Sequence, residues 1–315
     1  MGGLRVSNEV LLAKTETTYA TDPTPTVGSN AILVRNASIA SEGLRMDKRQ
    51  AVRASLGQLQ DVYGGKLARL TFEVEVKGSG SLGVAPEVGP LIEACGFDEA
   101  IVASTSATYT PESAAHESVT LWWYEGGKKK HVLNGCRGNM SIKLDAGGIC
   151  VMSFEFVGHY TAPTDVSLPS PTYNSTVPRA AVGMAVAING VTAIVAKSWE
   201  WHLNNALAMP PSIGAADGYG EIIITARDVR GSIEIESELA SVIDLDTLLS
   251  AGTRFAFASG TLGSVNGNKF SLSTPSSSTY VTKADPAEGN GLRHRRVELA
   301  VDDSTANTEL SLVFV

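Results

Sequence analysis

The stretch 64–77 constrains the fold more than any other part of the sequence. After two glycines its apolar and polar residues alternate, as in the run Phe72-Glu73-Val74-Glu75-Val76. A period of two residues is the pattern of a β-strand with one buried face and one face in water. The order of residue types in 69–75 returns in residues 230–236, at an offset of 230 − 69 = 161 residues in a chain of 315. The sequence therefore predicts one β-rich unit that occurs twice.

Other expected elements recur in the same order. Residues 87–97 and 240–251 each have the pattern of a short helix that follows a strand. The strands expected at 296–302 and 309–315 match those expected at 140–145 and 152–158, and Phe314 lies 314 − 156 = 158 residues after Phe156. The predicted fold class is mainly β, with two tandem β-sandwich or barrel domains that each carry a short flanking helix.

Composition suggests where these domains begin and end. The first 30 residues are polar and rich in Thr, so we expect an extended arm that is either frayed or ordered against a neighbouring subunit. Four of the 13 prolines lie within residues 161–179, which predicts a linker. The predicted domains are an N-terminal arm at 1–30, a first β domain at 31–160, the linker at 161–179 and a second β domain at 180–315.

Charge and cysteine content exclude several classes of protein. The formal net charge is −8 and the pI is about 5.2, which argues against a basic surface that binds nucleic acid. Cys95, Cys136 and Cys150 are an odd number of cysteines, so we expect reduced core residues rather than a disulfide framework. The sequence has no signal peptide and no run of about 18 apolar residues, which predicts a soluble protein without a membrane partner.

The glycines of the run Gly78-x-Gly80-x-x-Gly83 follow a strand and precede a helix, as in a dinucleotide-binding loop. Such a loop follows a strand that is buried on both faces, whereas Glu73 and Glu75 predict an exposed face here. We interpret the glycines as a flexible turn.

Metal and catalytic motifs were also considered. His131, Cys136, Cys150 and His159 lack the paired spacing of zinc ligands. The sequence contains no nucleophile elbow, no zinc-protease helix and no phosphate-binding loop. We therefore predict a protein that is not an enzyme, with no catalytic, cofactor-binding or metal-binding residues and no cofactor.

Aromatic residues leave one competing function open. Trp122, Trp123, Trp199 and Trp201 could form a sugar platform, which would suit a carbohydrate-binding or adhesin module of two β-sandwiches. Trp199 and Trp201 fall on one face of a predicted strand, so core or subunit packing is the simpler interpretation. The lysines at 128–130 are interpreted as a solvated hairpin tip.

Acidic residues recur on the polar faces of the predicted strands. Glu73 and Glu75 correspond to Glu234 and Glu236, and Asp145 corresponds to Asp302. Repeated negative charge would suit the wall of a channel for a polyanion, because attraction would slow its transit. Plain solvated sheet faces would give the same pattern. The candidates for such a wall are Glu73, Glu75, Asp145, Glu155, Glu234, Glu236 and Asp302.

Four stretches of the first half carry a resemblance to a known family. They are residues 11–25 (LLAKTETTYATDPTP), 30–34 (NAILV), 63–77 (YGGKLARLTFEVEVK) and 85–97 (APEVGPLIEACGF). They resemble the major tail tube protein of long-tailed, non-contractile bacteriophages. The related tubes of contractile injection systems are a nearby alternative. The second half is covered through the internal repeat.

The resemblance implies a structural virion protein with two tail-tube-like domains. Its sheets would join around a ring, and stacked rings would form a hollow tube that conducts double-stranded DNA without reading its sequence. Implied partners are other copies of the chain, the tape measure protein, and the tail terminator and distal tail proteins. Assembly is expected in the host cytoplasm, and the mature location is the virion tail.

The resemblance also implies which segments bridge successive rings. These would be the arm at 1–30 and the long inter-strand loop at 42–65. Both are expected to be mobile before assembly. The interface candidates are Tyr19, Arg45, Asp47, Lys48, Arg49 and Arg53. If each half fills one of six ring positions, three chains would close a ring with pseudo-sixfold symmetry.

Overall fold

The structure is a computed structural model that describes residues 8–275, 278–289, 291–302 and 305–315. The described residues form a mainly β protein, as predicted, with several antiparallel sheets. Two short helices, α1 (Gly89–Glu93) and α2 (Leu245–Ser250), lie within the predicted helical stretches and are shorter than them.

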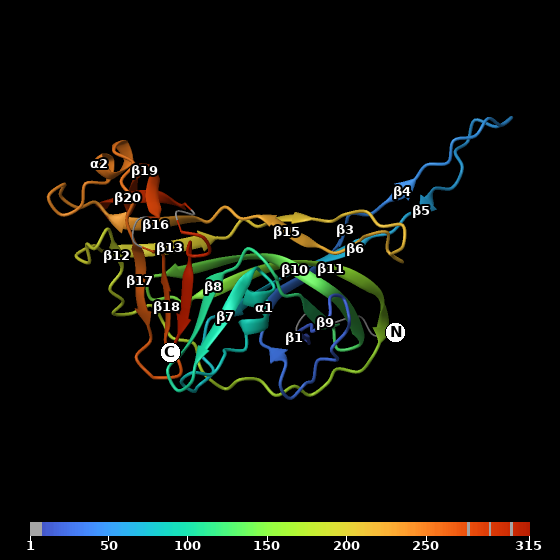
Figure 1. Cartoon of the computed structure of the whole chain (residues 1–315), viewed down its shortest axis with the longest axis horizontal. Coiled ribbons are helices and arrows are strands. Elements are labelled where there is room, and N and C mark those ends of the chain that lie inside the picture. The colour runs from blue at the N-terminus through green and yellow to red at the C-terminus, as the bar shows by residue number, and fades with distance from the viewer. Residues whose placement is uncertain (1–7, 276–277, 290, 303–304) are drawn as a thin grey trace.

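The larger sheet has 11 strands, and eight of them form a continuous antiparallel path. Figure 1 shows this path with β19 and β20 at one side of the molecule and β3 and β6 at the other. Across the sheet the order is β19 (Thr279–Gly289), β20 (Leu292–Val301), β16 (Arg230–Glu236), β13 (Ala196–His202), β10 (Lys129–Asp145), β11 (Val151–Asp165), β6 (Leu67–Glu75) and β3 (Arg35–Glu42). A side branch continues from β10 through β9 (Val119–Glu125) and β1 (Val10–Thr15) to β2 (Ala31–Ile32).

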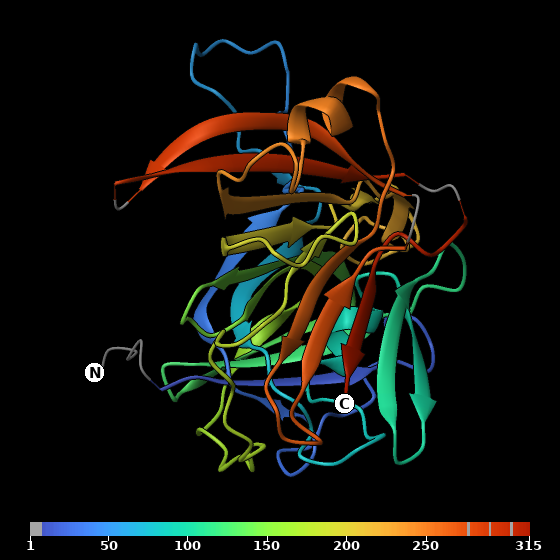
Figure 2. The same cartoon turned by 90° about the vertical axis from the view of Figure 1, so that its left-hand side faces the viewer.

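A second sheet of six strands packs against the first (Figures 1 and 2). Its order is β12 (Ala187–Ile188), β17 (Phe257–Leu262), β18 (Phe270–Ser273), β21 (Ser311–Phe314), β8 (Ser106–Pro111) and β7 (Phe97–Val102). Two small ladders complete the strands, one of β4 (Met46–Asp47) with β5 (Val62–Tyr63) and one of β14 (Ala206–Ala208) with β15 (Ile223–Ala226).

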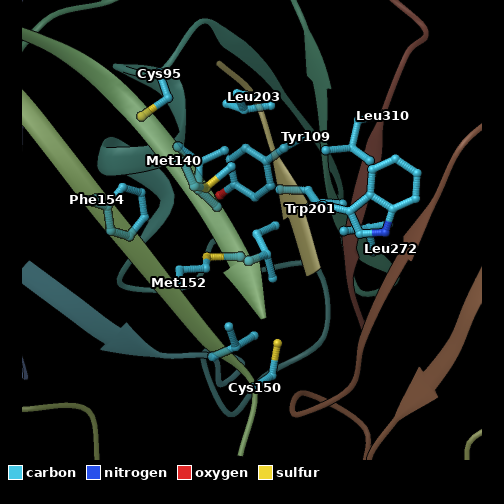
Figure 3. Close-up of a cluster of buried hydrophobic side chains, with 14 of the residues drawn as sticks. Cys95, Tyr109, Met140, Cys150, Met152, Phe154, Trp201, Leu203, Leu272 and Leu310 are labelled. Carbon is cyan, nitrogen blue, oxygen red and sulfur yellow. The ribbon is translucent and has the colours of Figure 1, made fainter. Parts of the chain in front are cut away.

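The core lies between the two sheets, and the alternation in 64–77 explains how it forms. In β6 the apolar residues Leu70, Phe72 and Val74 are at most 2% exposed, while the intervening residues reach solvent. One continuous cluster of buried side chains includes residues from both halves of the chain. Figure 3 shows part of it, where Met140 and Trp201 of the large sheet lie beside Tyr109 and Leu272 of the second sheet. The two halves therefore share a core and both sheets.

The three cysteines and the tryptophan pair are core residues, as predicted. Cys95, Cys136 and Cys150 are free thiols with no exposed surface, and burial raises their pKa values. Trp199 and Trp201 are 3% and 1% exposed. Trp123 is 3% exposed, and Trp122 is only partly buried. The three buried indole rings therefore cannot contribute to the sugar platform that the alternative function requires.

The last strands pair differently from the sequence prediction. The final strand, β21, was expected to correspond to 152–158, which lies in β11, but it belongs to the second sheet. The neighbour of β16 is β20, just as the neighbour of β6 is β11. The strand β19 then occupies the place of β10. The sequence did not predict β19 as a strand, because Lys283-Ala-Asp-Pro-Ala-Glu288 contains a proline and little apolar alternation.

The first 30 residues do not form a detached arm where the structure describes them. Strand β1 pairs with β9 and β2, and Leu11 and Leu12 are at most 1% exposed. The polar composition of the whole segment concealed the apolar run Val10-Leu-Leu-Ala13, which buries both faces of an inner strand. Residues 1–7 of the predicted arm lie outside the described residues.

The expected linker is shorter than predicted and fastened to the body. Strand β11 continues through Pro163 to Asp165. Beyond it, the side-chain amide of Asn174 donates to the carbonyl of Gly78, and Lys77 Nζ donates to the carbonyl of Asn174. The glycine turn at 78–80 is packed rather than flexible, because a Cβ on Gly78 would lie 2.0 Å from the Gly267 carbonyl oxygen.

Candidate assembly surfaces

The outer face of the eight-strand path is polar, and we call it the polar face. One row across it joins Arg35, Glu73, Ser153, Ser141, His202 and Arg230 through successive strand pairs. Glu75 and Asp145 lie in adjacent rows. Glu155 faces Thr71 of β6, while Glu234 and Glu236 face Arg296 and His294 of β20. Six of the seven acidic candidates thus occupy one face of one sheet.

The seventh acidic candidate lies elsewhere. Asp302 follows the end of β20, and its Oδ2 is 2.5 Å from Nε of Arg254, a residue of the loop before β17. Its correspondence with Asp145 is not reproduced by the strand pairing, because β20 occupies the place of β11 and not that of β10.

Cations are interleaved with the acidic side chains of the polar face. Glu73 pairs with Arg35 at 2.8 Å, Glu155 pairs with Arg69 at 2.5 Å, and Lys197 pairs with Glu234 at 2.6 Å. The face is therefore mixed in charge, with less net negative potential than the acidic residues alone suggested. Exposed pairs of this kind contribute at most about 1 kcal/mol each to stability. Whether the face lines a channel stays a prediction.

A shallow groove of about 350 Å³ crosses the polar face between β3 and β13. Its wall combines polar residues with the apolar residues Phe72, Met140 and Phe154. The polar residues are Asn36, Thr71, Glu73, Asn139, Ser141, Ser153, Glu155, His202 and Asn204.

Each outer strand of the eight-strand path pairs with one other strand in the described residues. Strand β3 pairs with β6, and β19 pairs with β20, although Thr279 at the start of β19 also forms an antiparallel bridge with Phe255. Pro286 in β19 is typical of an edge strand, because proline cannot donate a ladder hydrogen bond. Each chain thus presents two strand edges, one at each side of the sheet, and the edge of β19 is open beyond Thr279.

The loop at 42–65 forms a projecting hairpin, in agreement with the predicted long inter-strand loop. The ladder of β4 and β5 lies at its base, and residues 48–60 beyond the ladder are almost entirely exposed. Figure 1 shows the hairpin extending away from the body beside β3 and β6. Asp47 lies in β4, and Lys48, Arg49 and Arg53 follow it into the exposed part.

A segment of the second half clamps the base of this hairpin. The Arg45 guanidinium donates to the Gly218 carbonyl at 2.9 Å and lies 3.9 Å from the centre of the Tyr219 ring. The Tyr219 hydroxyl in turn donates to the carbonyl of Gly43. Arg45 is therefore a residue that fixes the hairpin within its own chain. Sequence reasoning missed this clamp, because its two sides are about half the chain apart.

Tyr19 is likewise an intramolecular residue in this structure. Its hydroxyl lies 3.2 Å from Nε2 of His159 and accepts a hydrogen bond from the backbone N–H of Ile222 at 2.7 Å. His159 Nδ1 is 2.6 Å from Asp217 Oδ2. Burial raises the pKa of Tyr19. The group ties the N-terminal segment, β11 and the second half together. A role of Tyr19 at a subunit interface stays a prediction.

A group of carboxylates surrounds α1 and the edge strand β7. Glu93 lies near Asp98, Glu99 and Glu117, and Thr15 Oγ1 donates to Glu93 at 3.0 Å. Burial, followed by the neighbouring negative charges, raises the pKa of Glu93 to about 7. The sequence signal for this group is that residues 78–127 contain no Lys or Arg.

The raised pKa of Glu93 predicts a pH-dependent stability. The unfolded carboxyl ionises near pH 4.5, whereas the folded one keeps its proton to about pH 7, so the folded state loses stability as pH rises between these values. We expect Glu93→Gln to be more stable than the wild type at pH 8 and close to it at pH 5, as measured by urea denaturation. An equal difference at both pH values would contradict the prediction.

A mainly β chain whose sheet has two open edges and whose hairpin projects from the body has the architecture of a structural subunit. A model of the phage tail tube protein family matches residues 7–301, which is nearly the whole chain. The chain therefore belongs to the phage tail tube protein family and is a structural component of the virion tail. A search of the curated proteins found no match. In the part of the chain that the structure describes, no helix is long and apolar enough to cross a membrane.

Proposed function

We propose that the chain polymerises into stacked rings that form the hollow tail tube of a long-tailed, non-contractile phage. The observation that carries this proposal is the eight-strand antiparallel path with an unpaired strand at each side. Because the path has an even number of alternating strands, β3 and β19 run in opposite directions. Rotation about the tube axis does not change whether a strand runs up or down that axis. Strand β3 of one chain therefore meets β19 of the next chain as an antiparallel pair.

Strand spacing supports three chains in each ring. Three chains supply 3 × 8 = 24 strands. At about 4.8 Å between strands, 24 strands give a circumference of about 115 Å and a diameter of at least about 37 Å. Side chains occupy about 5 Å on each wall, which leaves about 27 Å for a DNA duplex. Six chains would leave a lumen of about 63 Å by the same spacing, far wider than a duplex needs.

The two halves would give such a ring its pseudo-sixfold symmetry. The path divides into β3, β6, β11 and β10 from the first half, followed by β13, β16, β20 and β19 from the second half. In the first half the two-stranded ladder of β4 and β5 lies between β3 and β6, and in the second half the ladder of β14 and β15 lies between β13 and β16. A short helix and a β-hairpin follow β6 and β16. We infer a duplicated tube domain from this repeated order.

The polar face would line the lumen in this arrangement. Its mixed charges neither attract nor strongly repel a passing duplex. Free ions screen the remaining electrostatic interaction within about 10 Å. The tape measure protein would occupy the lumen before the DNA, and the terminator and distal tail proteins would meet the ends of the tube, as the resemblance to non-contractile phage tails implies.

Negative-stain electron microscopy of the purified protein, with and without tail seeds, tests the proposal. We expect hollow tubes whose end views contain three chains, with native mass spectrometry of isolated rings as an independent count. Six chains per ring would contradict the proposed stoichiometry. Monomers under all conditions would contradict polymerisation itself.

A further inference from the structure

Two surfaces of the chain carry opposite charges that form no ion pair with a residue that the structure describes. The first is the exposed end of the hairpin, residues 48–60, which contains Lys48, Arg49 and Arg53 and no acidic residue. Among the described residues, none of these three side chains forms an ion pair with a carboxylate. Val52 and Leu56 of the same segment are fully exposed.

The second surface is the open edge formed by β7, which we call the β7 edge. Strand β7 is the last strand of the second sheet and pairs only with β8 within the described chain. It carries Asp98 and Glu99, and Ile101 and Val102 are 43% and 53% exposed. An open edge with exposed apolar residues is a surface on which another chain can dock.

Further carboxylates flank the β7 edge. They are Glu93 of α1, Glu112 after β8 and Glu117 before β9, and the charges of Asp98 and Glu117 act on both Glu93 and Glu112. In the described residues none of the five carboxylates has a lysine or arginine within ion-pair distance. The edge therefore has a repulsive excess of negative charge that a cationic partner would relieve.

These two surfaces cannot meet inside one chain. Figures 1 and 2 show the hairpin projecting beyond the large sheet, while β7 lies in the body on the other side of that sheet. We propose that the hairpin tip of one copy docks on the β7 edge of a second copy, with its three cations against the acidic residues and with Val52 and Leu56 against Ile101 and Val102. The inference rests on the proposed tube, in which it would join subunits of successive rings.

Charge reversal on each surface tests the docking. Arg49→Glu with Arg53→Glu on the hairpin, or Asp98→Lys with Glu117→Lys on the β7 edge, should raise the concentration needed for tube formation about tenfold or more, because like charges would then face each other. Asp98 and Glu117 suit this test because, in the described part of the chain, their side chains form no hydrogen bond that the fold needs. Sedimentation and electron microscopy measure the assembled fraction.

The combined four-residue variant is the decisive arm. It restores opposite charges with their signs exchanged, so it should assemble at a lower concentration than either two-residue variant. Asp165→Lys with Glu238→Lys is the matched control for the variant of the β7 edge, since it makes the same change in net charge away from both surfaces and should leave the threshold unchanged. Failure of the combined variant to recover would overturn the docking.

A disulfide test does not depend on tube formation. One chain carries Ser55→Cys and another carries Ala100→Cys, while the three native cysteines stay buried. Mixing the two should give a disulfide between different chains, and pairs of Ser55→Cys chains alone should not. If wild-type tubes form but the mixed disulfide is absent, the docking is wrong and the tube proposal stands. If no tubes form, the tube proposal fails, and absence of the disulfide in concentrated solution overturns the docking separately.

Discussion

One of the two variants Ala40→Pro and Ser41→Pro should remain a stable monomer that no longer forms tubes. Both residues lie in β3, at the side of the sheet where no other strand pairs in the described chain. Successive N–H groups of a strand point to opposite sides. One substitution therefore removes an N–H that bonds β6, and the other removes an N–H that points outward to the neighbour in the proposed ring.

The two variants control each other. The one that breaks the bond to β6 should lower the free energy of unfolding, because it removes a bond within the fold. The variant that removes the outward N–H should have the same melting temperature as the wild type, since edge strands tolerate proline. It should not form tubes, because the proline ring and the missing donor interrupt the pairing with β19 of the neighbouring chain. Thermal melting and electron microscopy on both identify which is which. Tubes formed by both variants would contradict edge pairing as the basis of the ring.

The alternation of apolar and polar residues is the feature from which the sequence predicted strands best. The alternating stretches at 69–75 and 230–236 are both strands of the larger sheet, β6 and β16. Such strands could be found because one face is buried against the core, and burial enforces a period of two. The same rule failed for β19, which lies at the edge and buries little, and whose Pro286 reads as a strand breaker.

Segments that are held in place by contacts with residues far away in the sequence could not be predicted from local sequence patterns. Strand β1 is short and sits in a polar stretch, and its burial depends on β9, more than 100 residues away. The clamp of Arg45 on Tyr219 and the Tyr19–His159 contact join residues that no periodicity relates. The sequence could place three of the predicted interface residues, Lys48, Arg49 and Arg53, on a long loop. They belong to a charged stretch between two strands, and this stretch has no apolar periodicity and therefore little to bury.

Lys77→Met should lower the free energy of unfolding by about 3–5 kcal/mol, the cost of leaving a buried charge without its partner. Lys77 and Glu87 have side chains only 4% and 10% exposed, and Nζ lies 3.2 Å from Oε1. Lys77 also donates a hydrogen bond to the carbonyl of Asn174. It therefore joins the segment between β6 and α1 to the segment that connects the two halves of the chain. Urea denaturation measures the loss. The matched control is Lys283→Met. Its ion pair with Asp285 is more than half exposed, so this substitution should change the free energy of unfolding far less than Lys77→Met does.

The pH dependence of this loss separates a missing charge from a missing side chain. Burial raises the pKa of Glu87, and the positive charge of Lys77 opposes that rise, so Lys77→Met should raise the pKa further. The folded variant then holds a proton that the unfolded chain releases near pH 4.5, and its stability falls as pH rises above that value. The deficit should be larger at pH 8 than at pH 5. A double variant with Glu87→Leu should recover most of the loss, because two apolar side chains leave no buried charge. A deficit that is independent of pH and persists in the double variant would mean that packing of the lysine stem, rather than the ion pair, fastens the two halves here.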